Sequence, residues 1–239
     1  AEATKNAVIG LPDHGRKVSL RDDRMLARLA IVDPALTDGT PWAVTLASGL
    51  DAVTQVIEPF VSVKATPYTD AISAPAIGVG LMALQRLRQG EDKGARDTLA
   101  WVSLSGGLAL ANAGLGAVHG LAGVIGGLCP APHGAVCGAL LAPILRVNRD
   151  HAEAGSEAAR RLDVVFATIA EHLGGTAKDA PDTLAHWAKA AGLPGLTAMG
   201  FAPDWQEKTA EAALGASSTK GNPVVLPHAA LLDALRRAA

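Results

Sequence analysis

The sequence predicts a mostly α-helical fold, a multi-helix bundle of about eight to ten helices with a small β-hairpin at its N-terminus. Apolar residues recur at helical spacing through most of the chain beyond residue 34, and β-like runs are nearly confined to the residues before it. Hydrophobic residues make up 49% of the 239-residue chain but aromatic residues only 3%. Small aliphatic side chains, mostly Ala, Leu and Val, are therefore expected to fill closely packed helix interfaces.

The first 34 residues predict a small β segment. Short β-like runs at residues 6–9 and 17–20 flank the turn Pro12-Asp13-His14-Gly15, which favours a β-hairpin. An apolar run at residues 29–32 predicts a further strand or an extended segment. We therefore expect two parts, an N-terminal hairpin and strand segment over residues 1–34 and a helical domain over residues 35–239.

Start and stop signals divide the rest of the chain into helices. Thr40 and Pro41 favour the start of a short helix over 42–48, which Gly49 is expected to interrupt before a second helix over 50–60. Residues 67–88 predict a long helix, and residues 96–113 are so apolar that we expect a helix buried on most sides. The remaining helices are expected over 116–126, 133–147, 154–173, 182–190, 203–214 and 226–237.

Residues 98–145 contain no acidic or basic side chain. The run is long enough to cross a bilayer twice, but glycines, three prolines and two histidines break it, so we favour a buried helical core over a membrane span. A net charge of −2 gives no indication of binding to nucleic acid or an anionic membrane. Two cysteines without a disulfide pattern, and no visible secretory signal, predict a cytoplasmic protein.

Two histidines of the uncharged stretch, His119 and His133, are candidate metal ligands. A buried imidazole without a partner costs about 1–3 kcal/mol, so each ring needs one. Asp51 lies on another helix, with Gln55 and Glu58 at i+4 and i+7 on the same face. Two imidazoles and a carboxylate in a charge-poor core fit a three-ligand site that leaves a position open for water or substrate.

Each of these residues also has an ordinary structural explanation when it is taken alone. Asp51 can be a helix cap or solvated, His119 a hydrogen-bonded core histidine, and His133 the cap of its helix. Cys129 is close in sequence to the two histidines, but a small buried hydrophobic role is favoured for it. It is the combination that favours a metal site.

The order and spacing of several short motifs resemble the C-terminal helical domain of the iron-containing alcohol dehydrogenase family, the superfamily that includes glycerol dehydrogenase and maleylacetate reductase. The fourteen-residue interval between His119 and His133 is the most specific of these features. The matching segments are Ile31-Val-Asp33-Pro34-Ala-Leu36, Pro41, Ser48-Gly49-Leu50-Asp51-Ala52, Gly116-Ala-Val-His119-Gly, Pro132-His133-Gly134, Leu140-Leu141-Ala-Pro143, Asn148 and Gly221-Asn222-Pro223-Val224.

The resemblance implies a ligand set. Asp51 matches the family's aspartate ligand, and His119 and His133 match its two downstream histidine ligands. Iron-dependent members place another histidine four residues after the aspartate, where this chain has Gln55, a weaker transition-metal ligand. The implied cofactor is therefore a divalent metal, Fe²⁺ or Zn²⁺, with Gln55 as a weak ligand or an outer contact.

The chain also departs from the family pattern. Gly123 stands where members usually have a histidine near the substrate, and Cys137 stands where alcohol dehydrogenases often have Asn. Family enzymes bind NAD(P) through an N-terminal α/β domain, and no glycine-rich G-x-G-x-x-G turn follows a strand in this sequence. We expect that domain to be absent from this chain, which would then be a fragment, one of two polypeptides, or a protein that has lost the reaction.

Two functions from different classes are consistent with these residues. The first is the metal-binding catalytic half of an NAD(P)-dependent alcohol dehydrogenase or carbonyl reductase, in which the metal polarises the oxygen of a small alcohol, aldehyde or ketone. The second is a degenerate, non-catalytic helical domain that acts as a binding or oligomerisation partner, which Gln55 and Gly123 favour. The resemblance also implies a homo-oligomer, and a separate cofactor-binding domain is a further expected partner.

Overall fold

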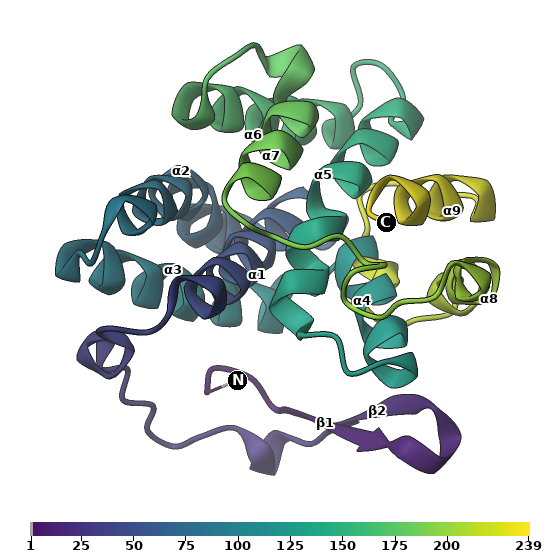
Figure 1. Ribbon diagram of the computed structural model, residues 1–239, viewed down its shortest axis with the longest axis horizontal. Helices are drawn as coiled ribbons and strands as arrows, with labels where there is room; N and C mark the ends of the chain where they lie inside the picture. Colours follow the sequence, from purple (N-terminus) through teal and green to yellow (C-terminus); the bar gives the residue numbers. More distant parts are fainter. Residues whose placement is uncertain (1) are drawn as a thin grey trace.

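The computed structural model describes residues 2–239, and in that part of the chain it contains nine α-helices and one β-hairpin (Figure 1). The predicted fold class is therefore confirmed. The helices are α1 (Trp42–Val61), α2 (Pro67–Gln89), α3 (Lys93–Ala113), α4 (Ala117–Leu128), α5 (His133–His151), α6 (Glu157–Leu173), α7 (Ala180–Ala190), α8 (Gln206–Leu214) and α9 (His228–Arg237).

The N-terminal hairpin is present as predicted and is slightly longer. Strands β1 (Asn6–Leu11) and β2 (Arg16–Arg21) pair antiparallel, with Asn6 opposite Arg21. Gly15 closes the turn with a φ of 55°, a conformation that glycine adopts without steric cost. Residues 29–33 form no strand, and Leu29 and Ile31 are 76% and 80% exposed.

The central helix α1 corrects one prediction, because Gly49 lies inside it instead of dividing it in two. A Cβ atom at Gly49 would lie 2.5 Å from Cδ2 of Leu84 on α2. The glycine therefore allows α1 and α2 to approach closely. The packing energy of this contact outweighs the cost of glycine in a helix, about 1 kcal/mol relative to alanine. Leu46, Leu50 and Ile57 of the same helix are fully buried in the core.

Helix α3 corrects a second prediction. It lies at the edge of the bundle and packs against α1 and α2, so one face stays open to solvent (Figure 1). Trp101 is 45% exposed, whereas Val102 and Ala109 are buried. Small residues such as Gly106 make the buried face. An apolar sequence thus produced a one-sided helix, because α1 and α2 cover one side and leave residues such as Trp101 open to solvent.

The long uncharged stretch is divided between helices. Among the described residues, no single helix has the length and apolar character needed to cross a membrane. Helices α3 and α4 pass that test only together, and they meet at a bend of 100°.

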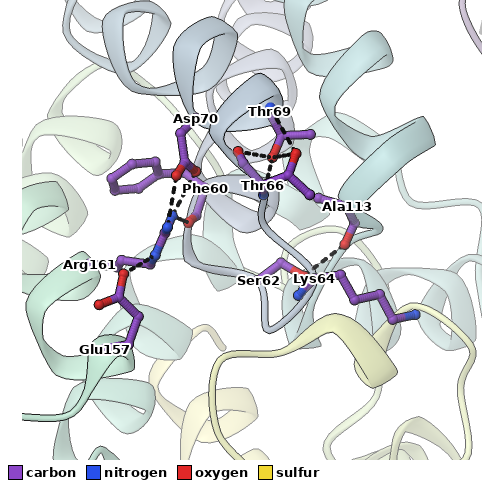
Figure 2. Close-up of polar contacts among 9 residues, drawn as sticks. All are labelled: Phe60, Ser62, Lys64, Thr66, Thr69, Asp70, Ala113, Glu157 and Arg161. Carbon is purple, nitrogen blue, oxygen red and sulfur yellow. Dashed lines mark hydrogen bonds and ion pairs between the residues drawn. The ribbon is translucent and has the colours of Figure 1, made fainter.

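Side chains from distant segments satisfy the backbone where α1 ends and α2 begins (Figure 2). Thr66 and Thr69 form a capping box at the first turn of α2. Arg161 of α6 donates to the carbonyl oxygen of Phe60 at 2.7 Å and to both carboxylate oxygens of Asp70 at 2.7 and 2.8 Å. One guanidinium therefore joins α1, α2 and α6.

We expect Arg161→Met to lower the free energy of unfolding by about 2 kcal/mol. The methionine keeps much of the apolar stem but leaves the Phe60 carbonyl and the Asp70 carboxylate without their donor. Urea unfolding followed by circular dichroism measures the loss. Arg160→Met is the matched control, because the exposed Arg160 contacts only its own segment and should contribute less. Equal losses for the two variants would contradict this role of Arg161.

Candidate metal centre

Helices α1, α4 and α5 bring the three predicted ligands together. Asp51 comes from the middle of α1, His119 from the first turn of α4 and His133 from the start of α5. Cys137, one turn after His133, joins them. One potential ligand atom from each of these four residues lies within 4.8 Å of the other three.

Two glycines of α5 set the approach of that helix to α1. A Cβ atom at Gly134 would lie 2.5 Å from the carbonyl oxygen of Ala47, which is a backbone atom and cannot rotate away. A Cβ atom at Gly138 would lie 2.8 Å from Cδ1 of Leu50. The N-terminal turn of α5 therefore lies directly on the turn of α1 that precedes Asp51, and this contact places His133 beside the carboxylate.

The first turn of α4 is held by side chains from two other segments. Glu58 Oε1 accepts a hydrogen bond from the Val118 amide at 2.7 Å, and Asn222 Oδ1 accepts one from the Ala117 amide at 3.1 Å. These are two of the amides that a helix N-terminus leaves without an internal partner. Asn148 accepts a hydrogen bond from the Asn222 side chain at 2.6 Å and so holds that side chain in place.

The same Glu58 carboxylate orients the ring of His119. His119 Nδ1 donates to Glu58 Oε2 at 2.6 Å, because an ionised carboxylate can only accept. The other ring nitrogen, Nε2, then faces Asp51 Oδ1 at 3.2 Å. Both of these atoms are buried, and neither makes a well-formed hydrogen bond to any residue that the structure describes.

This arrangement fits a metal ion. In the neutral ring the lone pair of His119 Nε2 points towards the carboxylate of Asp51, so two acceptor atoms face each other. Two buried acceptors without a donor between them cost free energy, and a proton or a metal cation removes that cost. His133 lies on the same side, with its ring centroid 5.5 Å from that of His119.

The pKa values of the cluster reflect burial and close charges. Burial opposes ionisation of Asp51, but the neighbouring rings of His119 and His133 outweigh it and lower its pKa. Burial also opposes the charged form of His119. The neighbouring side chains of Cys137, Glu58 and Asp51 outweigh that effect and raise the pKa of His119 well above the usual value. For His133, burial dominates and lowers the pKa. Burial raises the pKa of Cys137 to about 11.

Gln55 and Cys129 occupy the places that their sequence positions indicate. Gln55 lies one turn after Asp51 on α1, and its side-chain amide adds a little to the lowering of the pKa of that carboxyl group. Cys129 is buried at the end of α4 and its thiol donates to the carbonyl of Ile125, so it behaves as a small core residue. It is not one of the four clustered residues.

Sequence reasoning missed the parts of Cys137 and Glu58 in this centre. Cys137 follows His133 by four residues on one helix, so the i, i+4 spacing would have placed them on one face. Glu58 shares a helical face with Asp51, which was recognised, but its two acceptor contacts depend on where α4 lies. Asn222 belongs to a segment that resembles the family, but sequence reasoning assigned no role to it. In the structure its side chain accepts a hydrogen bond from the first turn of α4.

Residues 45–239 match the C-terminal domain of the Fe-containing alcohol dehydrogenase family. The chain belongs to this family. It is 35% identical over 175 residues to alcohol dehydrogenase 4 of Schizosaccharomyces pombe, and this match covers 73% of this chain and 40% of that protein. It is 34% identical over 238 residues to the NAD-dependent methanol dehydrogenase of Bacillus methanolicus, which covers 94% of this chain and 59% of that protein.

A solved structure shares the fold. The crystal structure of a 1,3-propanediol oxidoreductase superposes with a TM-score of 0.86 at 29% identity, and the match covers 99% of this chain and 62% of that one. The chain therefore spans less than two thirds of the length of these relatives. The family is named for iron, and one of these relatives is an NAD-dependent enzyme. The cluster around Asp51 is the candidate site for a metal ion.

Glu58→Gln is expected to lower the affinity for a divalent metal about 10- to 100-fold, the usual effect of losing an outer contact to a metal-binding histidine. The amide can donate to Nδ1 of His119, which moves the ring proton to Nε2, or it can turn its NH₂ group against the Val118 amide. Competition with a chromogenic chelator for Zn²⁺ measures the change. Glu157→Gln, which removes an exposed carboxylate on α6, is the control. Unchanged affinity in Glu58→Gln would refute the orienting role.

Two glycine variants separate close packing from helix propensity. Gly134→Ala must displace the backbone of α1, so it should lower both the unfolding temperature and the metal affinity. An added Cβ at Gly123 meets no atom within 4 Å, so Gly123→Ala should stabilise the protein by about 0.5–1 kcal/mol with metal affinity unchanged. Calorimetry and metal titration measure both effects. Tolerance of Ala at position 134 would show that the helix contact does not set the position of His133.

Proposed function

We propose that this chain is the metal-binding catalytic half of an NAD(P)-dependent alcohol dehydrogenase or carbonyl reductase. The observation that carries the proposal is the cluster of potential ligand atoms from Asp51, His119, His133 and Cys137, in which Asp51 Oδ1 and His119 Nε2 are buried without a well-formed hydrogen bond. Asp51, His119 and His133 would hold a divalent ion, with Gln55 next to Asp51. When bound, the ion polarises the alcohol or carbonyl oxygen and stabilises the charge of the alkoxide.

The residues of the chain define how a substrate would reach the ion. His133 is the exposed member of the cluster, whereas Cys137 is fully buried and His119 is 8% exposed. A substrate would therefore approach from the side of His133, and the core would exclude water from the opposite side. Gly123, one turn after His119 on α4, is exposed, and a Cβ atom added there would meet no atom within 4 Å.

The substrate and the partners follow from the relatives as proposals. The compared proteins are named for methanol and for 1,3-propanediol, so we propose a short alcohol, or the corresponding aldehyde or ketone, as the substrate. The nicotinamide would come from an NAD(P)-binding domain of the kind that completes the family enzymes, on this polypeptide or on a separate one. A homo-oligomer in the cytoplasm is the proposed setting.

A non-catalytic helical domain is the second candidate, and two residues favour it. Gln55 and Gly123 stand where the family pattern has imidazoles, so the chain offers fewer nitrogen ligands and no ring near the substrate for a proton relay. In that case the domain would act as a binding or oligomerisation partner. Metal content distinguishes the two candidates.

Elemental analysis of the chain, purified without chelator, tests the proposed function. We expect close to one equivalent of iron or zinc per chain, and loss of the metal in an Asp51→Ala/His133→Ala double variant. An Asp163→Ala/His186→Ala double variant, with both substitutions outside the cluster, is the control and should keep the metal. Absence of metal from the unmodified protein, even after incubation with Fe²⁺ or Zn²⁺, would overturn the proposal in favour of the non-catalytic domain.

A further inference from the structure

We propose that Cys137 is a ligand of the metal and that it takes the coordination position that Gln55 leaves without an imidazole. The inference rests on the proposed metal-binding function. It assigns to this chain an Asp-His-His-Cys ligand set with one thiolate, to which a substrate oxygen would add as a fifth ligand, and it predicts a preference for Zn²⁺ over Fe²⁺.

The position of Cys137 supports coordination. It lies on α5 four residues after His133, so both side chains leave the helix on the same face. Its Sγ atom is 3.6 Å from His133 Nε2 and within 4.8 Å of a ring nitrogen of His119. Ligands of a tetrahedral zinc ion, with bonds of about 2.0–2.3 Å, lie about 3.3–3.8 Å apart. The 3.6 Å between Cys137 and His133 falls within this range, and the 3.2 Å between His119 and Asp51 lies just below it.

The other cysteine of the chain shows that this position is not simply that of a buried thiol. Cys129 is also buried, but its Sγ donates to the carbonyl of Ile125, and it is not one of the four clustered residues. Cys137 is fully buried, and its thiol faces two imidazoles and lies near a carboxylate. These nitrogen and oxygen atoms are the ones that would bind the same metal ion as a Cys137 thiolate.

Gln55 explains why a fourth ligand has to come from another helix. A side-chain amide suits Mg²⁺ or Ca²⁺ and binds Zn²⁺ or Fe²⁺ weakly, so α1 supplies only Asp51. A coordinated thiol loses its proton outright and binds as the thiolate. Thiolate is a soft ligand that favours Zn²⁺ over Fe²⁺. Protein sites also have a higher intrinsic affinity for Zn²⁺ than for Fe²⁺, so both effects act in the same direction. Replacing an imidazole on α1 by a thiolate on α5 would therefore change which metal the site prefers, while the site stays at the same position in the fold.

Cobalt substitution tests the inference without any assay of activity. The full chain is stripped with chelator and titrated with Co²⁺, whose thiolate complexes show a ligand-to-metal charge-transfer band in the near ultraviolet. We expect this band in the unmodified protein and in Cys129→Ser, and its loss in Cys137→Ser. Zn²⁺ affinity should fall at least about tenfold in Cys137→Ser, and the preference for Zn²⁺ over Fe²⁺ should narrow.

A rescue variant guards against a folding defect in Cys137→Ser. Cys137→Ser/Gln55→His provides the imidazole on α1, so it should recover Zn²⁺ affinity while the charge-transfer band stays absent. If Co²⁺ binds the unmodified protein without the band, and Cys137→Ser binds Zn²⁺ equally well, Cys137 is not a ligand although the metal site stands. If the unmodified protein binds neither Co²⁺ nor Zn²⁺, the proposed metal-dependent function fails together with this inference.

Discussion

The carboxylate of Glu58 is the interaction on which the candidate centre depends. One oxygen accepts the Val118 amide at the start of α4, and the other accepts Nδ1 of His119 in the same turn. A single buried side chain of α1 therefore positions a helix and selects the tautomer of the ring on that helix. Neither effect is separable from the other, since the ring can face Asp51 only if α4 begins at this point.

Burial makes this arrangement strict. Glu58 is 4% exposed, so each of its oxygens needs a partner inside the protein. The Val118 amide and the His119 ring supply those partners, and Asn222 supplies the acceptor for the next amide. The hydrogen bonds are complete on the Glu58 side of His119 and incomplete on the Asp51 side. That difference locates the chemistry of the site, because the unsatisfied atoms converge where a cation would be stable.

Close helix contacts supply the remaining precision. Gly49 lets α1 and α2 approach, and Gly134 does the same for α1 and α5. Because α1 takes part in both contacts and also carries Asp51 and Glu58, the core and the candidate site share one rigid element. By contrast, the N-terminal segment with Leu29 and Ile31 exposes its apolar side chains and contributes little to this core.

The sequence by itself determined the helical class, most helix starts and the hairpin, because caps, prolines and periodicity act over a few residues. The capping box at Thr66 is one example. It also indicated Asp51, His119 and His133 as candidate metal ligands, because imidazoles are rare in an apolar core and because the spacing of these residues resembles the family pattern. Only the tertiary structure decided that Gly49 continues a helix, that α3 has an exposed face and that Cys137 joins the cluster. These outcomes depend on which helix lies against which, a long-range property that local patterns do not encode.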